Sequence, residues 1–367
     1  MKVAILVPGG LDRSGEQRVI PALLWLIERL AREVEVHAFA FTPAETNERY
    51  ELRGAHVHAV GRGLRPVRAA AAILAEHARG RFDVLHAFWA SRPGTVAVPL
   101  GQMLRIPVIV HLAGGETVAL PEIGYGSLCT RRGRMVIRSV LRGATVVTAP
   151  SRPIVEAAAR LGREAVRLPL GVARDVWPPC PPRARDTTRP ARLIHVASLN
   201  HVKDPFTLLS ALSRLAAGGV SFTLDIVGED TLHGLVEARA QNLGIADRVR
   251  FVGFRTQSQL RPLLLGADVM VMASRHEAGP IAALEAALSG VPVAGTAVGH
   301  LAEWAPDAAA VAPPGDAEAL ARAIDGLLKD EPRRLALARA AHVHAVSEDA
   351  DYTAARVLEL YRNLANR

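Results

Sequence analysis

The chain repeats one pattern, a short run of β-branched and aliphatic residues followed by a longer amphipathic stretch, over nearly its whole length. The first strand is predicted at Val3–Val7, and the helix after it over 16–33, where apolar residues recur at helical spacing. Strand–helix alternation of this kind predicts a parallel, doubly wound sheet, so the fold class is α/β. Further strands are predicted at 34–41, 57–60, 84–87, 108–112, 146–149, 192–197, 223–227, 249–251, 269–273 and 291–294.

A proline-rich segment over 173–190 interrupts this pattern and divides the chain into two predicted domains. It holds the run Asp175-Val176-Trp177-Pro178-Pro179-Cys180-Pro181-Pro182 and continues to Pro190, so neither a helix nor a central strand is favoured there. We predict a Rossmann-like domain over 1–172, a linker over 173–190 and a second Rossmann-like domain over 191–348. Two such domains facing each other leave a cleft between the carboxyl ends of their sheets, where ligands of these folds bind.

Composition excludes several classes of protein. Half of the 367 residues are hydrophobic, which rules out a disordered chain, and two cysteines are too few for a disulfide framework or a cysteine-based metal site. No apolar stretch approaches the ~18 residues of a membrane span. We see no signal peptide and expect a cytoplasmic protein.

Basic residues are concentrated in the N-terminal half, which carries essentially all of the net charge of +8. In one run, Arg131, Arg134, Arg138 and Arg142 fall on a single stripe of a helix. This stripe could meet an anionic membrane surface, so that the protein lies peripherally at the inner face, or a phosphate-bearing acceptor; the alternative is a solvated face. We expect no nucleic-acid partner.

The most informative segment is 273–293, where a strand ends at Ala273 and a nearly all-apolar helix begins at Gly279 and Pro280. Free backbone N–H groups and the positive dipole end of such a helix favour a phosphate. Glu277 precedes this start and Glu285 lies just over one turn into the helix. Carboxylates beside a phosphate site suit hydroxyl groups, so the pair fits a nucleotide-sugar. For Glu285 the alternative is a solvated helix residue.

With these residues the chain resembles the glycosyltransferase family 4 enzymes, retaining transferases of the GT-B fold with two Rossmann-like domains. Glu277 and Glu285 have the family's spacing, and Gly290-Val291-Pro292-Val293 follows as it does there. Four further segments resemble family signatures in the expected order: Leu168-Pro169-Leu170-Gly171-Val172, 194–208, Leu224-Asp225-Ile226-Val227-Gly228 and Val249-Arg250-Phe251-Val252-Gly253. The resemblance covers essentially the whole chain.

The resemblance implies roles for residues of the C-terminal domain. Glu277 would hold the donor sugar near its reacting carbon, Glu285 the ribose hydroxyls, and Lys203 the diphosphate leaving group, whose charge it would compensate. The alternative for Lys203 is a solvated residue near a helix start. The expected donor-binding set is completed by Asn200, Phe254, Ala278, Gly279, Pro280 and Ile281.

One departure from the family lies at Ala197-Ser198-Leu199, where Gly-Arg-Leu is usual. Ser198 can donate one hydrogen bond to the diphosphate but brings no charge. Compensation could come from Asn200, from backbone N–H groups or from a nearby arginine; otherwise donor binding is weaker.

In the N-terminal domain, the resemblance places the glycine-rich loop 9–15 over the donor phosphates, with Gly10 and Gly15 in contact with them. The alternative is an ordinary strand–helix turn. His111 ends a predicted strand in the region where the family often has a histidine facing the sugar and the acceptor, and a core histidine is the other interpretation. The terminal segment 349–367 is expected to pack back on this domain.

We therefore expect a retaining glycosyltransferase that moves a hexose from a UDP- or GDP-linked sugar to an acceptor hydroxyl. The 1–172 domain would bind the acceptor, and the 191–348 domain the donor. We expect no cofactor and no metal, since cationic side chains and helix dipoles can assist the departing diphosphate. The alternatives are a nucleotide-sugar-binding module with weak catalysis and a sugar-nucleotide epimerase of the same fold. The base, sugar and acceptor stay open.

Overall fold

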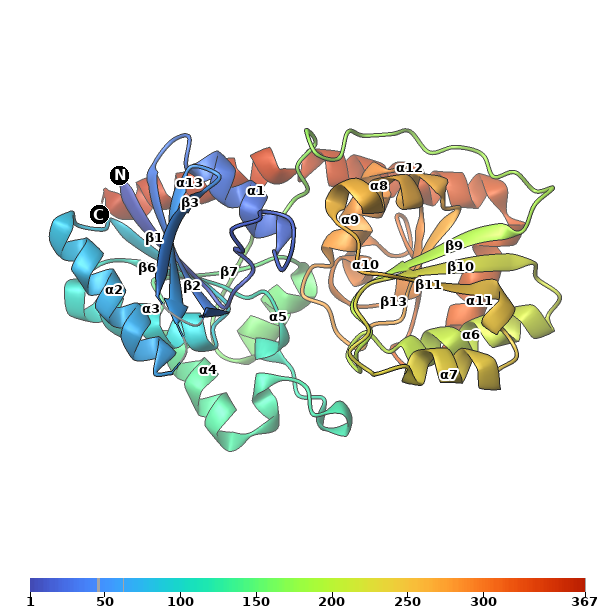
Figure 1. The fold of residues 1–367 in the computed structure, drawn as a ribbon, viewed down its shortest axis with the longest axis horizontal. Helices are drawn as coiled ribbons and strands as arrows, with labels where there is room; N and C mark the ends of the chain where they lie inside the picture. Colours follow the sequence, from blue (N-terminus) through green and yellow to red (C-terminus); the bar gives the residue numbers. More distant parts are fainter. Residues whose placement is uncertain (45–46, 62, 367) are drawn as a thin grey trace. The chain divides into compact units, whose positions relative to one another are not determined.

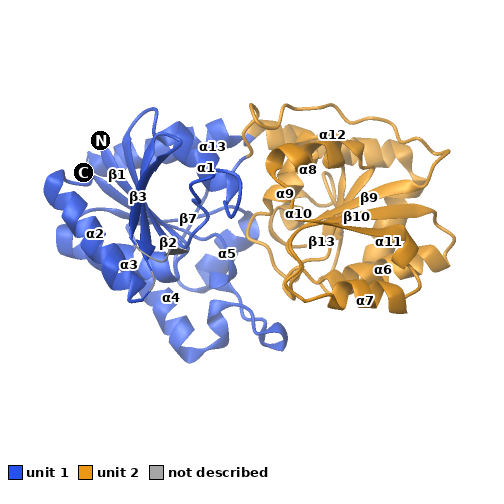
Figure 2. Cartoon of the chain, viewed as in Figure 1, with its two compact units in different colours: residues 1–171, 348–367 blue, residues 172–347 orange. Residues whose placement is uncertain are grey.

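The structure is a computed structural model that describes residues 1–44, 47–61 and 63–366. It contains two compact units (Figures 1 and 2). Unit 1 comprises residues 1–171 and 348–367, and unit 2 comprises residues 172–347. Each unit has a mainly parallel sheet with helices packed on it, so the predicted α/β class with two Rossmann-like domains is confirmed.

Unit 1 is built on an eight-stranded sheet of order β3-β4-β2-β1-β5-β6-β7-β8. Its interior strands read as apolar runs because helices cover the sheet. The strands are β1 (Lys2–Val7), β2 (Glu35–Ala44), β3 (Glu48–Leu52), β4 (Ala55–Gly61), β5 (Val84–Phe88), β6 (Val108–His111), β7 (Val146–Ala149) and β8 (Val166–Arg167).

Two strands of this sheet, β3 and the two-residue β8, were not predicted from the sequence. β3 pairs antiparallel with β4 through a two-residue turn at Arg53 and Gly54, both of which have positive φ. It lies at the edge of the sheet and most of its side chains are exposed, so it lacks the apolar run by which the other strands were recognised.

The helices of unit 1 are α1 (Pro21–Leu30), α2 (Arg65–Arg79), α3 (Arg92–Leu104), α4 (Arg131–Gly143), α5 (Arg152–Arg160) and α13 (Ala350–Ala365). The predicted helix at 16–33 was too long at both ends. The helix begins at Pro21, because the proline ring would clash with a preceding turn of helix. Arg18 has a φ of 50°, which lies outside the right-handed helical region.

The last helix of the chain packs within unit 1, although nearly the whole of unit 2 separates it from the rest of that unit in sequence. The Tyr361 hydroxyl lies 2.8 Å from Nδ1 of His86, a core residue of β5. Arg29 of α1 pairs with Asp351 at 2.7 Å. Through these contacts the last helix is bound to β5 and α1 of unit 1.

Unit 2 has a six-stranded parallel sheet of order β11-β10-β9-β12-β13-β14. The strands are β9 (Ala191–Val196), β10 (Phe222–Val227), β11 (Val249–Gly253), β12 (Val269–Met272), β13 (Val293–Thr296) and β14 (Ala310–Ala312). The helices are α6 (Pro205–Ala217), α7 (Leu235–Asn242), α8 (Gln257–Gly266), α9 (Ile281–Leu288), α10 (Gly299–Trp304), α11 (Ala317–Lys329) and α12 (Glu331–Ser347).

The proline-rich segment, residues 172–190, runs along unit 2 without forming a helix or a strand. The Cys180 N–H donates to the carbonyl of Leu288 at the end of α9, at 2.8 Å. Arg189 pairs with the buried carboxylate of Asp268, at 3.0 Å. The segment is therefore attached to unit 2 along its length.

Candidate functional site

The candidate site lies in unit 2, at the carboxyl ends of two neighbouring parallel strands. β9 leads into a loop over 197–204, and β12 leads into a loop over 273–280. Ligands of doubly wound sheets bind at this edge, because the loops and the helix N-termini that follow the strands converge there. The two loops carry the residues that the sequence singled out most strongly.

Lys203 and Glu277 form the centre of this site. The ammonium Nζ of Lys203 lies 2.5 Å from Oε1 of Glu277, and the Ser274 hydroxyl donates to the same oxygen at 2.7 Å. The side chain of Glu277 is 10% exposed and that of Lys203 is 26% exposed. A lysine in this ion pair is not a freely solvated residue, so the solvated alternative for Lys203 is wrong.

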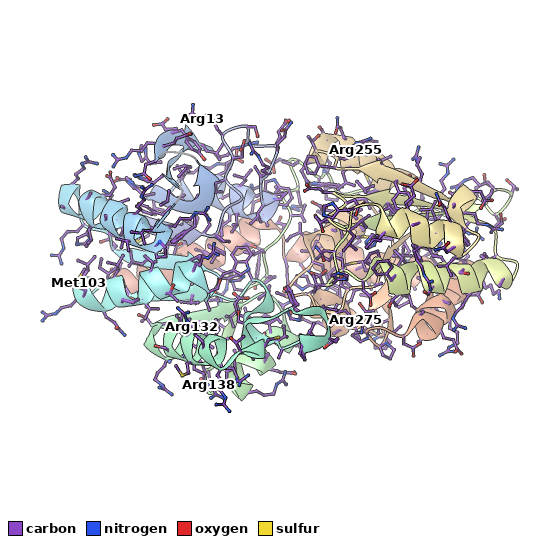
Figure 3. All side chains as sticks on the ribbon, turned by 60° about the horizontal axis from the view of Figure 1, so that its bottom comes forward. Arg13, Met103, Arg132, Arg138, Arg255 and Arg275 are labelled. Carbon is purple, nitrogen blue, oxygen red and sulfur yellow. The ribbon has the colours of Figure 1, made fainter. Side chains whose placement is uncertain are left out.

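The two loops are held together by Arg275 and Asp204. The Arg275 backbone N–H donates to the Val202 carbonyl at 2.7 Å, and its guanidinium pairs with Asp204, which also caps the start of α6. Arg275 is labelled in Figure 3. Its charge is matched by Asp204 in this structure.

The surroundings of Ser198 bear on how that missing charge could be replaced. The Ser198 side chain is exposed, and the Asn200 Oδ1 accepts a hydrogen bond from the Lys203 backbone N–H at 3.1 Å. Gly228, in the turn after β10, passes so close that a Cβ there would overlap the carbonyl oxygen of Ala197 and lie 3.0 Å from the Ser198 nitrogen. The two turns therefore pack backbone against backbone, which requires glycine at 228.

The start of α9 lies one residue later than predicted. Pro280 has an extended ψ of 111° and is the N-cap, and the helix begins at Ile281. Ala278 and Pro280 are buried, while Gly279 and Ile281 are partly exposed. The residues expected to bind a phosphate thus do lie at a helix N-terminus, directly after Glu277.

Glu285 lies within α9 and is 3% exposed, so the solvated alternative for this residue is wrong. Burial raises the pKa of its carboxyl to about 7, and a hydrogen bond with Gln257, the first residue of α8, acts in the opposite direction. This bond brings Glu285 to the loop that follows β11. Phe254, expected near the base, lies in that loop and is 52% exposed.

In unit 1, the structure places the candidate residues as follows. Gly10 has a φ of 82°, and a Cβ there would overlap the Ile20 side chain, so the local turn by itself requires glycine. Gly15 lies in the same loop with a φ of 67°. Both glycines belong to unit 1.

His111 is fully buried in the core of unit 1, beneath the carboxyl end of the sheet. Its Nδ1 lies 2.9 Å from the Thr148 hydroxyl, its ring packs against Phe88, and burial lowers its pKa to about 3. The ring is therefore neutral at ordinary pH and presents no nitrogen to solvent in this structure. This placement matches the alternative of a core histidine.

The basic helix α4 carries its arginines differently from the predicted stripe. Arg134 turns inward and donates to the Leu128 carbonyl at 2.7 Å. The exposed residues of the helix include Arg131, Arg132, Arg138 and Arg142 together with Ser139 and Met135, and Met135 is 70% exposed. Figure 3 shows Arg132 and Arg138 projecting from this helix.

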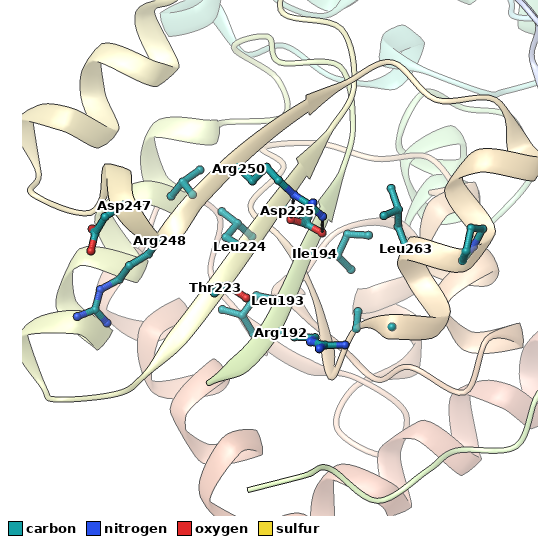
Figure 4. Close-up of a pocket in the computed structure, with 14 residues that line it drawn as sticks. Arg192, Leu193, Ile194, Thr223, Leu224, Asp225, Asp247, Arg248, Arg250 and Leu263 are labelled. Atoms are coloured by element: carbon teal, nitrogen blue, oxygen red, sulfur yellow. Dashed lines mark hydrogen bonds and ion pairs between the residues drawn. The ribbon is translucent and has the colours of Figure 1, made fainter. Parts of the chain in front are cut away.

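A cavity of about 460 Å³ lies elsewhere on unit 2, near the amino ends of β9 and β11 (Figure 4). Arg250 in this cavity pairs with Asp225 at 2.6 Å, and Arg248 donates to the Val220 carbonyl. The cavity is away from the carboxyl ends of these strands, and we do not assign the site to it.

Two kinds of site are absent from residues 1–44, 47–61 and 63–366. No three His, Cys, Asp or Glu side chains there come together as a metal site. No helix in these ranges is both long and apolar enough to cross a membrane.

Two family models match this chain, one on each unit. Residues 183–344 match the model described as glycosyl transferases group 1, and residues 19–171 match the glycosyl transferase 4-like domain. A D-inositol 3-phosphate glycosyltransferase from Corynebacterium urealyticum is 34% identical over 178 residues, which are 46% of this chain and 42% of that protein. The chain thus matches less than half the length of this curated relative.

Solved structures resemble the whole chain in fold. A sucrose-phosphate synthase from Thermosynechococcus elongatus has a TM-score of 0.84 at 22% identity, with 99% of both chains covered. The Anabaena protein HepE in complex with UDP and glucose has a TM-score of 0.76 at 17% identity, covering 99% of this chain and 100% of that one. At such identities the likeness is one of fold, and the fold is GT-B.

Proposed function

Since the chain belongs to the glycosyltransferases of the GT-B fold, we propose that it transfers a hexose from a nucleotide-diphosphate sugar to an acceptor hydroxyl with retention of the anomeric configuration. Unit 2 would bind the donor and unit 1 the acceptor. The observation that carries the proposal is the Lys203–Glu277 pair at the carboxyl ends of β9 and β12.

The chemistry of this pair supports a group-transfer role. When the glycosidic bond breaks, negative charge develops on the departing diphosphate, and a fixed ammonium beside it stabilises that charge. Lys203 can exchange Glu277 for a phosphate oxygen, because Ser274 would still hold the carboxylate in place. Glu277 would then bind the sugar hydroxyls next to the reacting carbon.

Two further features support a nucleotide donor. Glu285 and the loop around Phe254 would bind ribose and base, and the start of α9 would bind phosphate. HepE, which shares the fold, holds UDP and glucose. We propose a UDP- or GDP-linked sugar as the donor. The alternative of a binding module with weak catalysis derives from Ser198, whose side chain brings no charge.

A nucleotide panel tests the donor assignment. UDP, GDP and ADP bind only the folded protein, so the correct nucleotide should raise the melting temperature by the most. ADP is the control, because a shift as large as that of UDP or GDP would come from the diphosphate and not from the base. Equal shifts with all three would contradict a base-specific donor site. Hydrolysis or transfer of a radiolabelled donor sugar then separates an enzyme from a binding module.

The proposal includes peripheral contact with an anionic membrane through α4. Its exposed face combines four arginines with an exposed methionine, which suits anionic headgroups with shallow apolar contact. We expect the wild-type protein to sediment with phosphatidylglycerol-containing vesicles, and the double variant Arg138→Glu/Arg142→Glu to sediment several-fold less at low salt.

The control for this experiment carries the same change of charge at exposed arginines on other helices, Arg68→Glu/Arg239→Glu. It should sediment like the wild type. Equal loss in both double variants would mean that net charge alone governs binding, and no sedimentation of the wild type would remove the membrane contact from the proposal.

A further inference from the structure

A single residue of the loop after β12, Arg275, is bonded to the residues on both sides of Lys203. The Arg275 backbone N–H donates to the carbonyl of Val202 at 2.7 Å. Its guanidinium Nε donates to Oδ2 of Asp204 at 2.5 Å. Lys203 lies between these two residues and is therefore held against the β12 loop from both sides. Its Nζ reaches Glu277, two residues further along that loop than Arg275.

Asp204 has a backbone conformation that capping alone does not require. Its φ of 47° lies in the left-handed region, where residues with a Cβ are uncommon. Its carboxylate caps α6 by accepting from the Thr207 N–H at 3.1 Å. Asp316 and Asp349 cap α11 and α13 in the same way, with φ of −91° and −73°. The cap therefore does not explain the left-handed turn directly after Lys203, and strain of this kind is characteristic of functional positions.

The pair of Asp204 and Arg275 is packed on several sides. The side chain of Asp204 is 8% exposed, and its Oδ2 also accepts from the Thr207 hydroxyl at 2.7 Å. The guanidinium of Arg275 lies against Gly315, where an added Cβ would be 2.7 Å from Nη1. Gly315 belongs to the loop that follows β14, so three loops meet at Arg275. Because Asp204 is shielded from solvent, removal of Arg275 leaves a buried carboxylate without its cation.

Glu277 is held separately, by the residue that precedes Arg275. The Ser274 hydroxyl donates to Oε1 of Glu277 at 2.7 Å. The Thr296 hydroxyl, at the end of β13, donates to the Ser274 carbonyl at 2.6 Å. Ser274 thus holds the carboxylate, and Arg275 holds the chain around the lysine. A substitution of the Arg275 side chain therefore loosens Lys203 while Ser274 and Glu277 keep their bond.

We propose that Arg275 and Asp204 are positioning residues that hold the ammonium of Lys203 where it meets the departing diphosphate. This rests on the proposed function, which takes Lys203 as the group that compensates the charge of the leaving group. A lysine side chain has many conformations, so fixing the backbone on both sides of it limits the positions that the ammonium can reach. A charge that is fixed before the glycosidic bond breaks needs no reorganisation during the reaction.

The first experiment needs no ligand. The coupling between Lys203 and Glu277 is the non-additive part of their effects on the free energy of unfolding, measured with Lys203→Met, Glu277→Gln and the double variant. We expect a clear coupling in the wild-type background and the loss of most of it in the Arg275→Met background, because the lysine is no longer held beside the carboxylate. Asp204→Asn, which keeps the cap and tolerates a positive φ, should reduce the coupling as well.

The second experiment measures UDP and GDP affinity together with turnover of the donor sugar. Arg275→Met should lower affinity several-fold and turnover by up to about 100-fold, as expected when a reacting group is displaced by about 1 Å. In a Lys203→Met background the same substitution should have no further effect, because the group that it positions is gone. A general structural defect would lower affinity in both backgrounds. Arg275→Lys, which keeps a cation beside Asp204, should lose less of both quantities than Arg275→Met.

The control for both experiments is Arg322→Met, which removes an exposed ion pair with Glu318 on α11 and should match the wild type. Undiminished coupling in both Arg275→Met and Asp204→Asn overturns the positioning role. An equal loss of affinity from Arg275→Met with and without Lys203 overturns it too. Reduced coupling in a protein whose wild type binds neither UDP nor GDP instead overturns the proposed function, while the placement of Lys203 by Arg275 stands.

Discussion

The Glu277→Gln protein is expected to bind its nucleotide at least as tightly as the wild type and to turn over the donor sugar on the order of 10²–10³-fold more slowly. The amide is nearly the same size as the carboxylate, so Ser274 can still hold it. The negative charge is lost, and with it the ion pair to Lys203. A lysine freed in this way is available to the diphosphate, whereas the sugar loses a charged hydrogen-bond acceptor.

The measurement is release of radiolabelled sugar from the donor, alongside nucleotide affinity and the melting temperature. Glu237→Gln, at an exposed position of α7, is the matched control and should keep full turnover. Weaker nucleotide binding with normal turnover in Glu277→Gln would mean that Glu277 contacts the nucleotide and not the transferred sugar.

Glu285→Gln should change the pH dependence of stability more than any surface substitution. The pKa of Glu285 is about 7 in the folded protein, against an ordinary value of 4.5. Its protonated form is therefore favoured by folding: the stability it contributes is complete below about pH 4.5 and is lost as pH rises through 7. A glutamine carries no such loss.

The difference in unfolding free energy, variant minus wild type, should accordingly rise by about 3 kcal/mol between pH 4 and pH 8. Denaturant titrations at a series of pH values measure it, with Glu237→Gln as an exposed control for the same charge change. Nucleotide affinity should fall in the same variant. A difference that stays flat with pH would show that Glu285 titrates as an ordinary exposed glutamate.

A carboxyl that costs stability at neutral pH and has no cation beside it is characteristic of a functional site. In this chain the cost falls on the residue expected to bind the ribose. The sequence supplied the position of Glu285, through its spacing from Glu277, but not its burial. An apolar helix sequence predicts a buried helix without saying which neighbour the one polar residue will meet.

Much of the fold could be predicted because buried parallel strands and their covering helices have distinct apolar patterns. The exceptions are instructive. β3 is a polar edge strand without an apolar run, and β8 and β14, which were not predicted either, have only two and three residues. The helix α12 was not predicted, because its alanines, arginines and histidines form no clear apolar stripe. The start of α1 was misplaced because apolar residues before Pro21 continue the helical spacing.

The site was only partly predictable. Lys203 and Glu277 were both identified, but 74 residues separate them, and their ion pair exists because β9 and β12 are neighbours in the sheet. Ser274, three residues before Glu277, had a weak local signal, as a hydroxyl in the same loop. The predicted roles of Gly10, Gly15 and His111 remain without support from their surroundings.

Unit 1 is discontinuous in sequence, and this determines the order in which the two units can finish folding during synthesis. Unit 2 is one continuous stretch, residues 172–347, whereas unit 1 needs residues 348–367 as well as 1–171. Unit 2 can therefore finish folding while α13 is still inside the ribosome, because domains fold as units in the order in which they emerge. Until Tyr361 reaches His86, that histidine of unit 1 lacks this hydrogen-bond partner. Unit 1 begins first and is finished last.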